Sequence, residues 1–332
     1  MDSAEPSFVI PEAQAESLAA RSGLTVSRWL PSLVPSAKTL ARPPISRYHV
    51  CAVGLGPSGR VFVGVNLEFP GLPLHHSVHA EQFLLTNMSL HSEPHLTHLA
   101  VSAAPCGHCR QFLQELRHSS DVQLLVSPEP DLDSSADGVG NVGHGPDVDF
   151  KPLPVYLPHQ FGPHDLLSKN VPFLLEPHDN GLYLLVEQAD NSSRSNGNIN
   201  PVDYPLVQAA LEAANASHSP YSNCPSGVAL ADRHGRFYKG SYAESAAFNP
   251  SMSPMQAAIV AYVAGGGGGY EGIVRGVLVE KEGVAVRQEE TAKLFAKVVL
   301  PKCEFRVIHC GTKLGQQQCE ENGGGIQSKR NY

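Results

Sequence analysis

Residues 48–65, with the sequence YHVCAVGLGPSGRVFVGV, decide the fold of this chain. Residues that favour strands stand on both sides of Pro57-Ser58-Gly59, so the segment predicts a strand, a turn and a second strand. Apolar residues at helical spacing over 79–90 predict a helix. The elements expected next are a strand, a helix and a strand, at 96–102, 105–116 and 122–126. Strands that alternate with helices of about a dozen residues indicate a layered α/β domain.

Composition excludes several classes of protein. The chain has 332 residues, of which 42% are hydrophobic and 17% charged, so it can bury a sizeable core. Its net charge of −8 provides no basic field to attract nucleic acid or anionic lipid. The seven cysteines are irregularly spaced, the acidic N-terminus has no secretory pattern, and there is no long apolar run. These features predict a soluble cytosolic protein with no membrane partner. We expect exposed loops at 129–149 and 190–200, which are polar or glycine-rich.

The sequence repeats itself at an offset of 176 residues. The segment Gly59 to Gly64 is echoed by Gly235 to Gly240. The second copy has no cysteine pair, and Pro254 and Gln256 fall near the places of His79 and Glu81. We therefore expect only the first copy to be catalytic. The predicted division is an N-terminal helical segment, a catalytic zinc-binding domain and a non-catalytic repeat, at 1–44, 45–177 and 178–332.

The motif whose residue types suit metal binding and catalysis is His79-Ala80-Glu81 followed by Pro105-Cys106-Gly107-His108-Cys109. Zinc favours thiolate and imidazole ligands in tetrahedral geometry. With Pro105 at the first helical position, Cys106 and Cys109 would lie on one side of the first turn, where a helix N-terminus favours thiolates. His79 would be the third ligand, which leaves a fourth position for water. Glu81 could then accept a proton from that water and pass it to a leaving group.

Other interpretations of these residues remain open. The site could be a closed structural zinc site with His75, His76 or Cys51 as the fourth ligand, or the cysteines and the histidine could simply be buried without metal. His108 is expected on the surface or beside the ligands. Arg110 either donates to a ligand sulfur or is solvated.

The pattern H-x-E followed by P-C-x-x-C is the signature of zinc deaminases. The chain resembles the cytidine deaminases of the homodimeric, two-repeat branch, in which a catalytic domain precedes a zinc-free copy. The matching segments are Asn66 to Phe69, Pro105 to Phe112, Phe161 to Pro163 and Tyr242 to Pro250. The resemblance implies a duplicated three-layer α/β/α fold with a mixed sheet. It also implies hydrolysis of cytidine and deoxycytidine to uridine and deoxyuridine plus ammonia in pyrimidine salvage, with one Zn²⁺ per catalytic domain and a homodimer.

The same resemblance implies a role for each matching residue. His79, Cys106 and Cys109 would hold zinc, and Glu81 would move protons between water, N3 and the leaving amine. Asn66 and Glu68 would bind the sugar hydroxyls. Further contacts would come from the ring of Tyr48 on the pyrimidine, the backbone of Ala80 and Ala104, and Phe248 closing the partner subunit's site.

The charge of Glu68 favours a free nucleoside over a polynucleotide. A phosphate on the 3′ oxygen, about 4 Å away at an effective dielectric near 20, would repel this carboxylate by roughly 4 kcal/mol, whereas a free hydroxyl donates to it. Two alternatives to a nucleoside deaminase are a C-to-U polynucleotide editor, which needs basic and aromatic residues around the site, and a non-catalytic zinc protein that serves assembly.

Overall fold

The computed structural model describes residues 7–127, 149–185 and 203–312, which form two compact units. Unit 1 comprises residues 1–176, 244–252 and 260–267, and unit 2 comprises residues 177–243, 253–259 and 268–332. The loops expected at 129–149 and 190–200 lie, apart from residue 149, outside the described residues.

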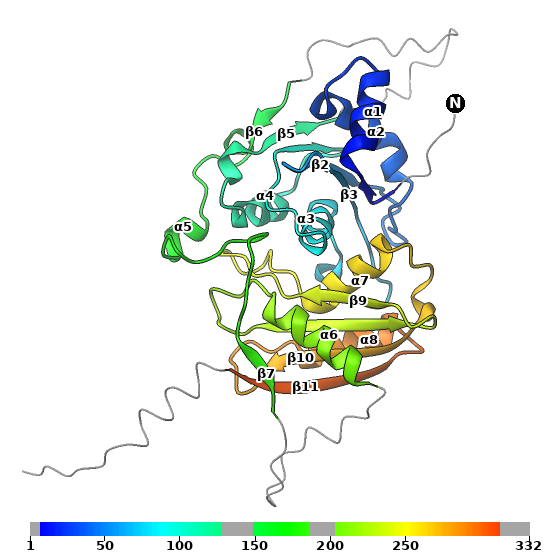
Figure 1. Ribbon diagram of the computed structural model, residues 1–332, viewed down its shortest axis with the longest axis vertical. Helices are drawn as coiled ribbons and strands as arrows, with labels where there is room; N and C mark the ends of the chain where they lie inside the picture. The colour runs from blue at the N-terminus through cyan, green and yellow to red at the C-terminus, as the bar shows by residue number, and fades with distance from the viewer. Residues whose placement is uncertain (1–6, 128–148, 186–202, 313–332) are drawn as a thin grey trace, which may run out of the picture. The chain divides into compact units, whose positions relative to one another are not determined.

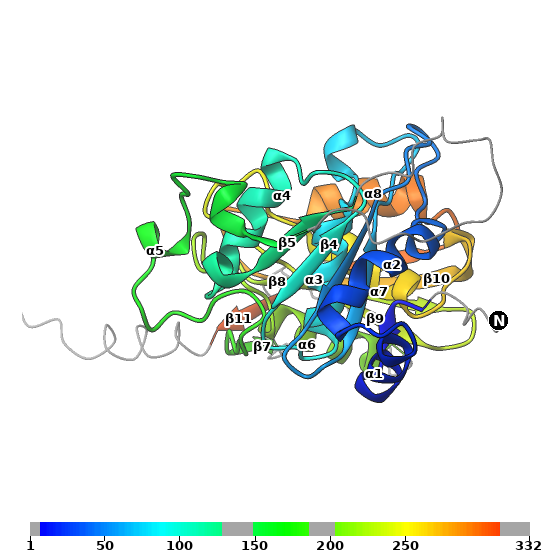
Figure 2. The ribbon, with the colours of Figure 1, turned by 90° about the horizontal axis from the view of Figure 1, so that it is seen from above.

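A six-stranded mixed sheet forms the centre of unit 1, in the order β1-β3-β2-β4-β5-β6. Its strands β4 and β5 are parallel and lie side by side (Figure 2), whereas all other neighbours are antiparallel. The strands are β1 (Val9–Ile10), β2 (Cys51–Leu55), β3 (Val61–Val65), β4 (His98–Val101), β5 (Gln123–Val126) and β6 (Lys151–Pro152). The four strands predicted between residues 48 and 126 are therefore confirmed, as β2 to β5.

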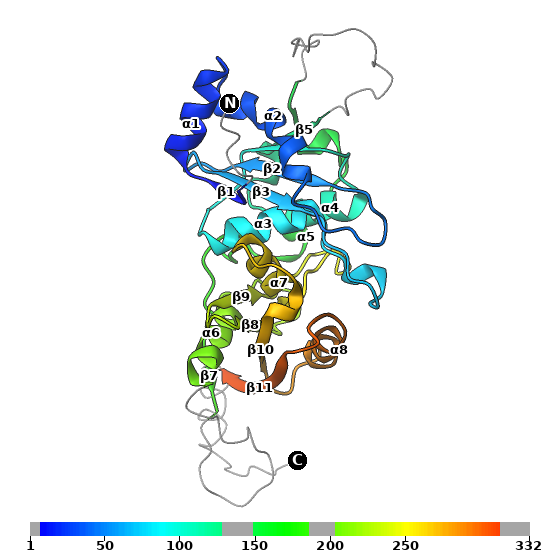
Figure 3. The same cartoon turned by 90° about the vertical axis from the view of Figure 1, so that its right-hand side faces the viewer.

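Helices cover both faces of this sheet (Figure 3). The helices are α1 (Glu12–Arg21), α2 (Val26–Lys38), α3 (Ala80–Leu90), α4 (Gly107–Phe112) and α5 (Pro163–Leu166), with 3₁₀ turns at Leu74–His76, Leu113–Glu115, Ser119–Asp121 and Leu153–Val155. On one face the Cys51 thiol donates to the Val34 carbonyl of α2. On the other face Gly64 lies so close to α3 that a Cβ there would stand 2.2 Å from the Ala80 carbonyl oxygen. Unit 1 thus has the three layers that were predicted.

Helix α4 begins two residues later than predicted. Cys106 is the N-cap, with extended backbone angles, so Pro105 precedes the helix and does not occupy its first position. Cys109 is then the third residue of the helix. The helix therefore starts at Gly107, between the two cysteines in the sequence.

Unit 2 repeats the architecture of unit 1. Its sheet has the order β7-β11-β10-β8-β9, with β10 and β11 parallel and β8 antiparallel to both β9 and β10. The strands are β7 (Leu182–Leu184), β8 (Ser226–Asp232), β9 (Phe237–Ser241), β10 (Ile273–Lys281) and β11 (Glu304–Thr312). Helix α6 (Tyr204–Asn215) packs its apolar side on one face (Figure 1). The remaining helices are α7 (Pro254–Ala264), whose last turn belongs to unit 1, and α8 (Glu289–Val299), with a 3₁₀ turn at Tyr270–Gly272.

The two repeats match residue by residue up to the end of the second strand. Gly59 and Gly235 both have positive φ, 77° and 79°, in the turn between the strands. Gly240 then lies under α7 as Gly64 lies under α3, because a Cβ on Gly240 would stand 2.1 Å from the Ala258 nitrogen. The duplicated fold is confirmed.

Beyond that point the second repeat is two residues shorter before its helix starts. Ser253 therefore occupies the place of His79, and Met255 that of Glu81. Pro254 and Gln256, expected near these places, each lie one residue beyond the equivalent position. None of the described helices is both long and apolar enough to cross a membrane.

Candidate metal centre

Three donor atoms converge where α3 and α4 begin. His79 is the N-cap of α3, Cys106 is the N-cap of α4, and Cys109 lies in the first turn of α4. The Nδ1 atom of His79 lies 3.5 Å from Sγ of Cys106 and 3.3 Å from Sγ of Cys109, and the two sulfurs are 3.7 Å apart. Zinc bonds of about 2.3 Å to sulfur and about 2.0 Å to nitrogen, at tetrahedral angles, separate two sulfurs by about 3.8 Å and sulfur from nitrogen by about 3.5 Å. The three residues therefore fit a tetrahedral zinc ion.

Hydrogen bonds among these three side chains shift their pKa values. Hydrogen bonds from Cys109 and His79 lower the pKa of Cys106 to about 3. The bond that the Cys109 thiol donates to Cys106, together with burial, raises the pKa of Cys109. The hydrogen bond to Cys106 likewise raises the pKa of His79. A divalent cation would displace these protons, so its binding would depend on pH.

The metal-binding group consists of His79, Cys106 and Cys109. Within the described part of the chain no fourth protein ligand joins it. Cys51 contacts α2 on the opposite face of the sheet, and burial raises the pKa of its thiol to about 11. His75 and His76 stand next to each other, with ring centroids 4.4 Å apart. This arrangement favours an open coordination position over the closed structural site.

Glu81 lies beside the sulfur ligands without belonging to the group. It is in the first turn of α3, its relative exposure is 4%, and its carboxyl group lies close to the side chain of Cys109. Burial raises the pKa of this carboxyl group. An acid with a raised pKa that touches a metal ligand suits the transfer of protons near neutral pH.

Asn66 and Glu68 flank a residue that is paired with the segment leading to His79. Leu67 and Val78, the residue before His79, exchange two backbone hydrogen bonds of 2.9 Å. The carboxylate of Glu68 accepts from the backbone nitrogens of Ile45 and Ser46 and from the Ser46 hydroxyl. Although burial raises the pKa of Glu68, these hydrogen bonds outweigh it and lower the pKa, so the group is ionised at neutral pH.

The other predicted contact residues are placed as follows. Tyr48 is 53% exposed, and its carbonyl accepts a hydrogen bond from the Asn66 side chain. Ala80 is buried at the start of α3, and Ala104 is exposed in the loop before Cys106. Phe248 is 69% exposed and has a φ of 61°, in a segment that belongs to unit 1 although its sequence is part of the second repeat.

His108 and Arg110 have specific partners. Arg110 donates to the carbonyl oxygens of Pro105 and Tyr156, so it holds the loop before α4 and does not donate to a sulfur. The ring of His108 lies 5.4 Å from that of His79, and its Nε2 donates to the Asn249 carbonyl. Of the two places expected for His108, the surface or beside the ligands, the structure favours the second, and its partner was not foreseen.

Gln82 and Glu115 were not identified from the sequence as residues near the site. Both are buried, and each is hydrogen-bonded to the backbone of the segment 244–252. A signal existed for Gln82, because Gln256 stands at the equivalent place in the second repeat. Each of these glutamines accepts a hydrogen bond from the backbone nitrogen of the residue three positions before it, His79 or Ser253.

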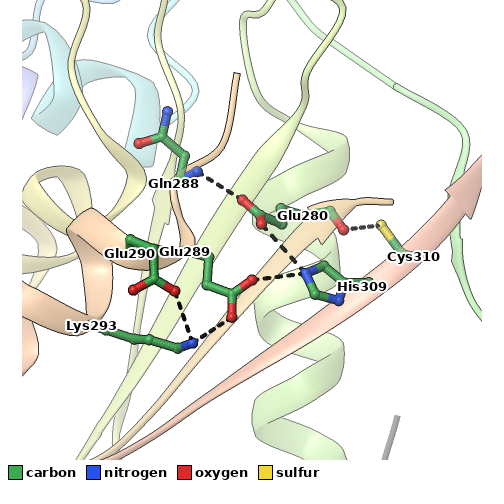
Figure 4. A network of polar contacts seen from close by, with 7 residues as sticks. All are labelled: Glu280, Gln288, Glu289, Glu290, Lys293, His309 and Cys310. Carbon is green, nitrogen blue, oxygen red and sulfur yellow. Dashed lines mark hydrogen bonds and ion pairs between the residues drawn. The ribbon is translucent and has the colours of Figure 1, made fainter. Parts of the chain in front are cut away.

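A second group of possible ligands lies in unit 2, at Glu280, Glu289 and His309 (Figure 4). These side chains are satisfied within the protein. His309 contacts both carboxylates, Glu280 also accepts from the backbone of Gln288, and the hydrogen bond from Lys293 lowers the pKa of Glu289. The network links β10, β11 and the start of α8, which explains it as a structural contact.

Comparisons with known proteins agree with the donor set. Two family models match residues 25–125 and 153–293, and both are described as the cytidine and deoxycytidylate deaminase zinc-binding region. Cytidine deaminase 1 of Arabidopsis thaliana is 56% identical over 310 residues, which is 92% of this chain and 98% of that protein. A cytidine deaminase of Yersinia pestis is 38% identical over 81% of this chain and 79% of its own length. A cytidine deaminase structure from Mycobacterium tuberculosis is 26% identical and covers 41% of this chain and 96% of that chain, with a TM-score of 0.32.

Proposed function

Because the chain belongs to the cytidine and deoxycytidylate deaminase family, we propose that it hydrolyses cytidine and deoxycytidine to uridine and deoxyuridine with release of ammonia. The observation that supports this most is the triangle of His79 Nδ1 and the two cysteine sulfurs, whose edges of 3.3 to 3.7 Å fit zinc. A buried carboxyl group beside an open metal position turns such a site into a hydrolytic one.

In this proposal His79, Cys106 and Cys109 hold zinc. Zinc held by these residues would supply a Lewis acid that activates water for attack on the base. Glu81 accepts a proton from the attacking water, protonates N3 of the ring and transfers the second proton to the leaving amine. Its burial keeps bulk water from competing for these protons, and its raised pKa lets it hold one between steps.

The remaining residues bind the nucleoside. Asn66 and Glu68 receive the sugar hydroxyls, because both flank the residue that pairs with Val78 next to His79. Glu68 is already ionised, so it attracts a hydroxyl donor and repels a phosphate. Tyr48 covers the pyrimidine ring, and the backbone groups of Ala80 and Ala104 contact O2 and the exocyclic amine.

The proposal extends to assembly and cellular role. We place the enzyme in pyrimidine salvage in the cytosol as a homodimer, in which the exposed Phe248 closes the partner subunit's site. The described cysteines are free thiols, as suits a reducing compartment. The N-terminal segment (1–44), the catalytic domain (45–177) and the non-catalytic repeat (178–332) remain the proposed division, and the two family models support the duplication.

The test is zinc analysis of the purified full-length protein together with the conversion of cytidine to uridine, followed by the loss of cytidine absorbance. We expect one zinc per chain and turnover of the free nucleosides. Zinc without turnover of any substrate would favour a non-catalytic role. Turnover of single-stranded polynucleotide in preference to cytidine would favour an editing enzyme. A wild-type protein purified without zinc and unable to take it up would overturn the proposal.

A further inference from the structure

One segment of the second repeat is built into unit 1. Residues 244–252, which we call the strap, belong to unit 1 by their contacts. The strap carries the exposed Phe248. Its backbone meets both helices that present the metal ligands.

Two consecutive carbonyl groups of the strap each accept a hydrogen bond from a different helix. Asn249 accepts from Nε2 of His108 at 2.8 Å, and Pro250 accepts from the side-chain amide of Gln82 at 2.9 Å. In the sequence, His108 stands between the two cysteine ligands. Gln82 also accepts from the backbone nitrogen of His79, at 3.4 Å. The strap therefore connects the α3 side of the metal group to its α4 side through adjacent peptide units.

Hydrogen bonds within the strap and from Glu115 fix its conformation. Ser245 accepts from the nitrogen of Phe248 at 2.8 Å, Phe248 accepts from Ser251 at 2.9 Å, and the Ser251 hydroxyl accepts from the nitrogen of Ser245 at 3.0 Å. The buried carboxylate of Glu115 accepts from the nitrogen of Ala246 at 2.7 Å. A turn closed by these bonds can hold two neighbours at a set distance, which a mobile loop cannot.

The orientation of the His108 ring depends on this strap. A carbonyl oxygen accepts and cannot donate, so Nε2 of His108 carries the proton. The other ring nitrogen, Nδ1, is buried and has no hydrogen-bond partner within the described residues. The bond to Asn249 is therefore the polar contact that fixes a ring lying 5.4 Å from His79.

We propose that the strap sets the separation of the two metal-bearing helix starts, and that His108 is a positioning residue that acts through its hydrogen bond to the Asn249 carbonyl. This inference rests on the proposed assignment of His79, Cys106 and Cys109 as the zinc ligands. It gives the non-catalytic repeat a function within its own chain, because that repeat supplies the strap. Outer groups that orient metal ligands typically change metal affinity by about 10–100-fold when they are removed.

The experiment compares His108→Phe with His108→Gln in the full-length protein. Phenylalanine keeps an aromatic ring next to His79 but cannot donate, whereas glutamine loses the ring and keeps an N–H donor. We expect His108→Phe to release zinc to a chelator about tenfold faster than the wild type. In the cobalt-substituted protein it should also shift the thiolate-to-cobalt absorption band. His108→Gln should restore both values to near those of the wild type.

Asn249→Ala is the matched control, because it removes an exposed side chain and leaves the accepting carbonyl in place. It should release zinc at the wild-type rate. Wild-type release rates and spectra for His108→Phe would overturn the inference, and so would rapid release from His108→Gln with an unchanged unfolding midpoint. A wild-type protein that takes up neither zinc nor cobalt would instead overturn the proposed function, so the two failures are distinguishable.

Discussion

The side chain of Asn66 donates a hydrogen bond of 2.9 Å to the carbonyl oxygen of Tyr48 and accepts one of 2.9 Å from the nitrogen of Val50. A residue expected to bind sugar thus also shapes the segment that presents Tyr48. Glu68 does the same for the preceding turn, since its carboxylate accepts from Ile45 and Ser46. With the proposed sugar-binding role, these two side chains would couple substrate binding to the conformation of residues 45–50.

This coupling predicts that Asn66→Ala affects binding and stability together. Loss of these two hydrogen bonds, of which the one from Val50 is partly buried and the one to Tyr48 is exposed, should lower the free energy of unfolding by about 1–3 kcal/mol. The KM for cytidine should rise by about tenfold or more, since each 1.4 kcal/mol of binding corresponds to a factor of ten. Asn66→Asp is the control, because it keeps the acceptor for Val50 and loses the donor to Tyr48. Steady-state kinetics and chemical denaturation measure both effects, and a raised KM with unchanged stability would contradict the coupling.

Glu81→Gln should separate metal binding from turnover. Glutamine fills the same space but cannot accept or carry the proton, so turnover should fall by roughly 10²–10⁴-fold. Zinc content should stay at the wild-type value, because Glu81 is not part of the donor triangle. Elemental analysis and initial rates on the same preparation are needed. Near-normal turnover in a zinc-loaded variant would show that another group moves the protons.

Much of this site could be predicted because its chemistry is local in sequence. His79 with Glu81, and Cys106 with Cys109, each lie within one helical turn, so their residue types and spacing were enough to expect a metal site. The strands around Pro57-Ser58-Gly59 were found for a similar reason, since turn residues and β-formers alternate there. Local patterns of this kind need no knowledge of the rest of the fold.

What could not be predicted depends on contacts between distant segments. The bond from His108 to Asn249 joins residues 141 positions apart, and no local pattern signals it. The start of α4 was misplaced because Pro105 fits a first helical position, whereas the N-cap is Cys106, whose backbone is extended. Arg110 was expected near sulfur or in solvent, but two carbonyl groups of the folded chain attract it more strongly.

Gly64→Ala should displace α3 and with it the metal ligand that precedes the helix. A Cβ there would stand 2.2 Å from the Ala80 oxygen and 2.5 Å from the Leu84 nitrogen, and backbone atoms cannot move aside as a flexible side chain can. We expect a loss of about 1–3 kcal/mol in stability together with reduced zinc content. Gly268→Ala is the control, because a Cβ added there would have nothing within 4 Å and the φ of Gly268 is not positive. Thermal unfolding and zinc analysis would show the effect, and full zinc retention would contradict it.

The two repeats stabilise the same turn with different carboxylates. In unit 2, Asp232 accepts from the nitrogens of His234 and Arg236. In unit 1 the equivalent of Asp232 is Gly56, and a Cβ on Gly56 would lie 2.2 Å from Oε1 of Glu93. Glu93 reaches the turn from beyond α3 and binds Ser58 and Arg60 in its place.

This exchange predicts a compensating pair of mutations in unit 1. Gly56→Asp alone should be strongly destabilising, because two carboxylates would overlap, and Glu93→Ala alone should cost about 1–3 kcal/mol by leaving polar partners unsatisfied. The double variant should recover more than half of the summed loss, since the introduced aspartate would supply the acceptor that Asp232 provides in unit 2. Denaturation of the four proteins gives the coupling energy. Additive losses would show that the turns are not equivalent.

Phe248→Gly should stabilise the strap while weakening the enzyme. With a φ of 61°, Phe248 has a left-handed conformation that costs a residue with a side chain roughly 1–2 kcal/mol, of which the greater freedom of unfolded glycine offsets about 0.5–1 kcal/mol. The ring itself is 69% exposed, so little packing is lost on its removal. Since the proposed role of the ring is to close the partner subunit's site, we expect kcat/KM for cytidine to fall by about tenfold. Phe248→Tyr, which keeps the aromatic ring, should retain activity. The measurements are chemical denaturation and initial rates over a range of protein concentrations. A less stable glycine variant would refute the strain, and a fully active one would refute the role of Phe248 in closing the partner subunit's site.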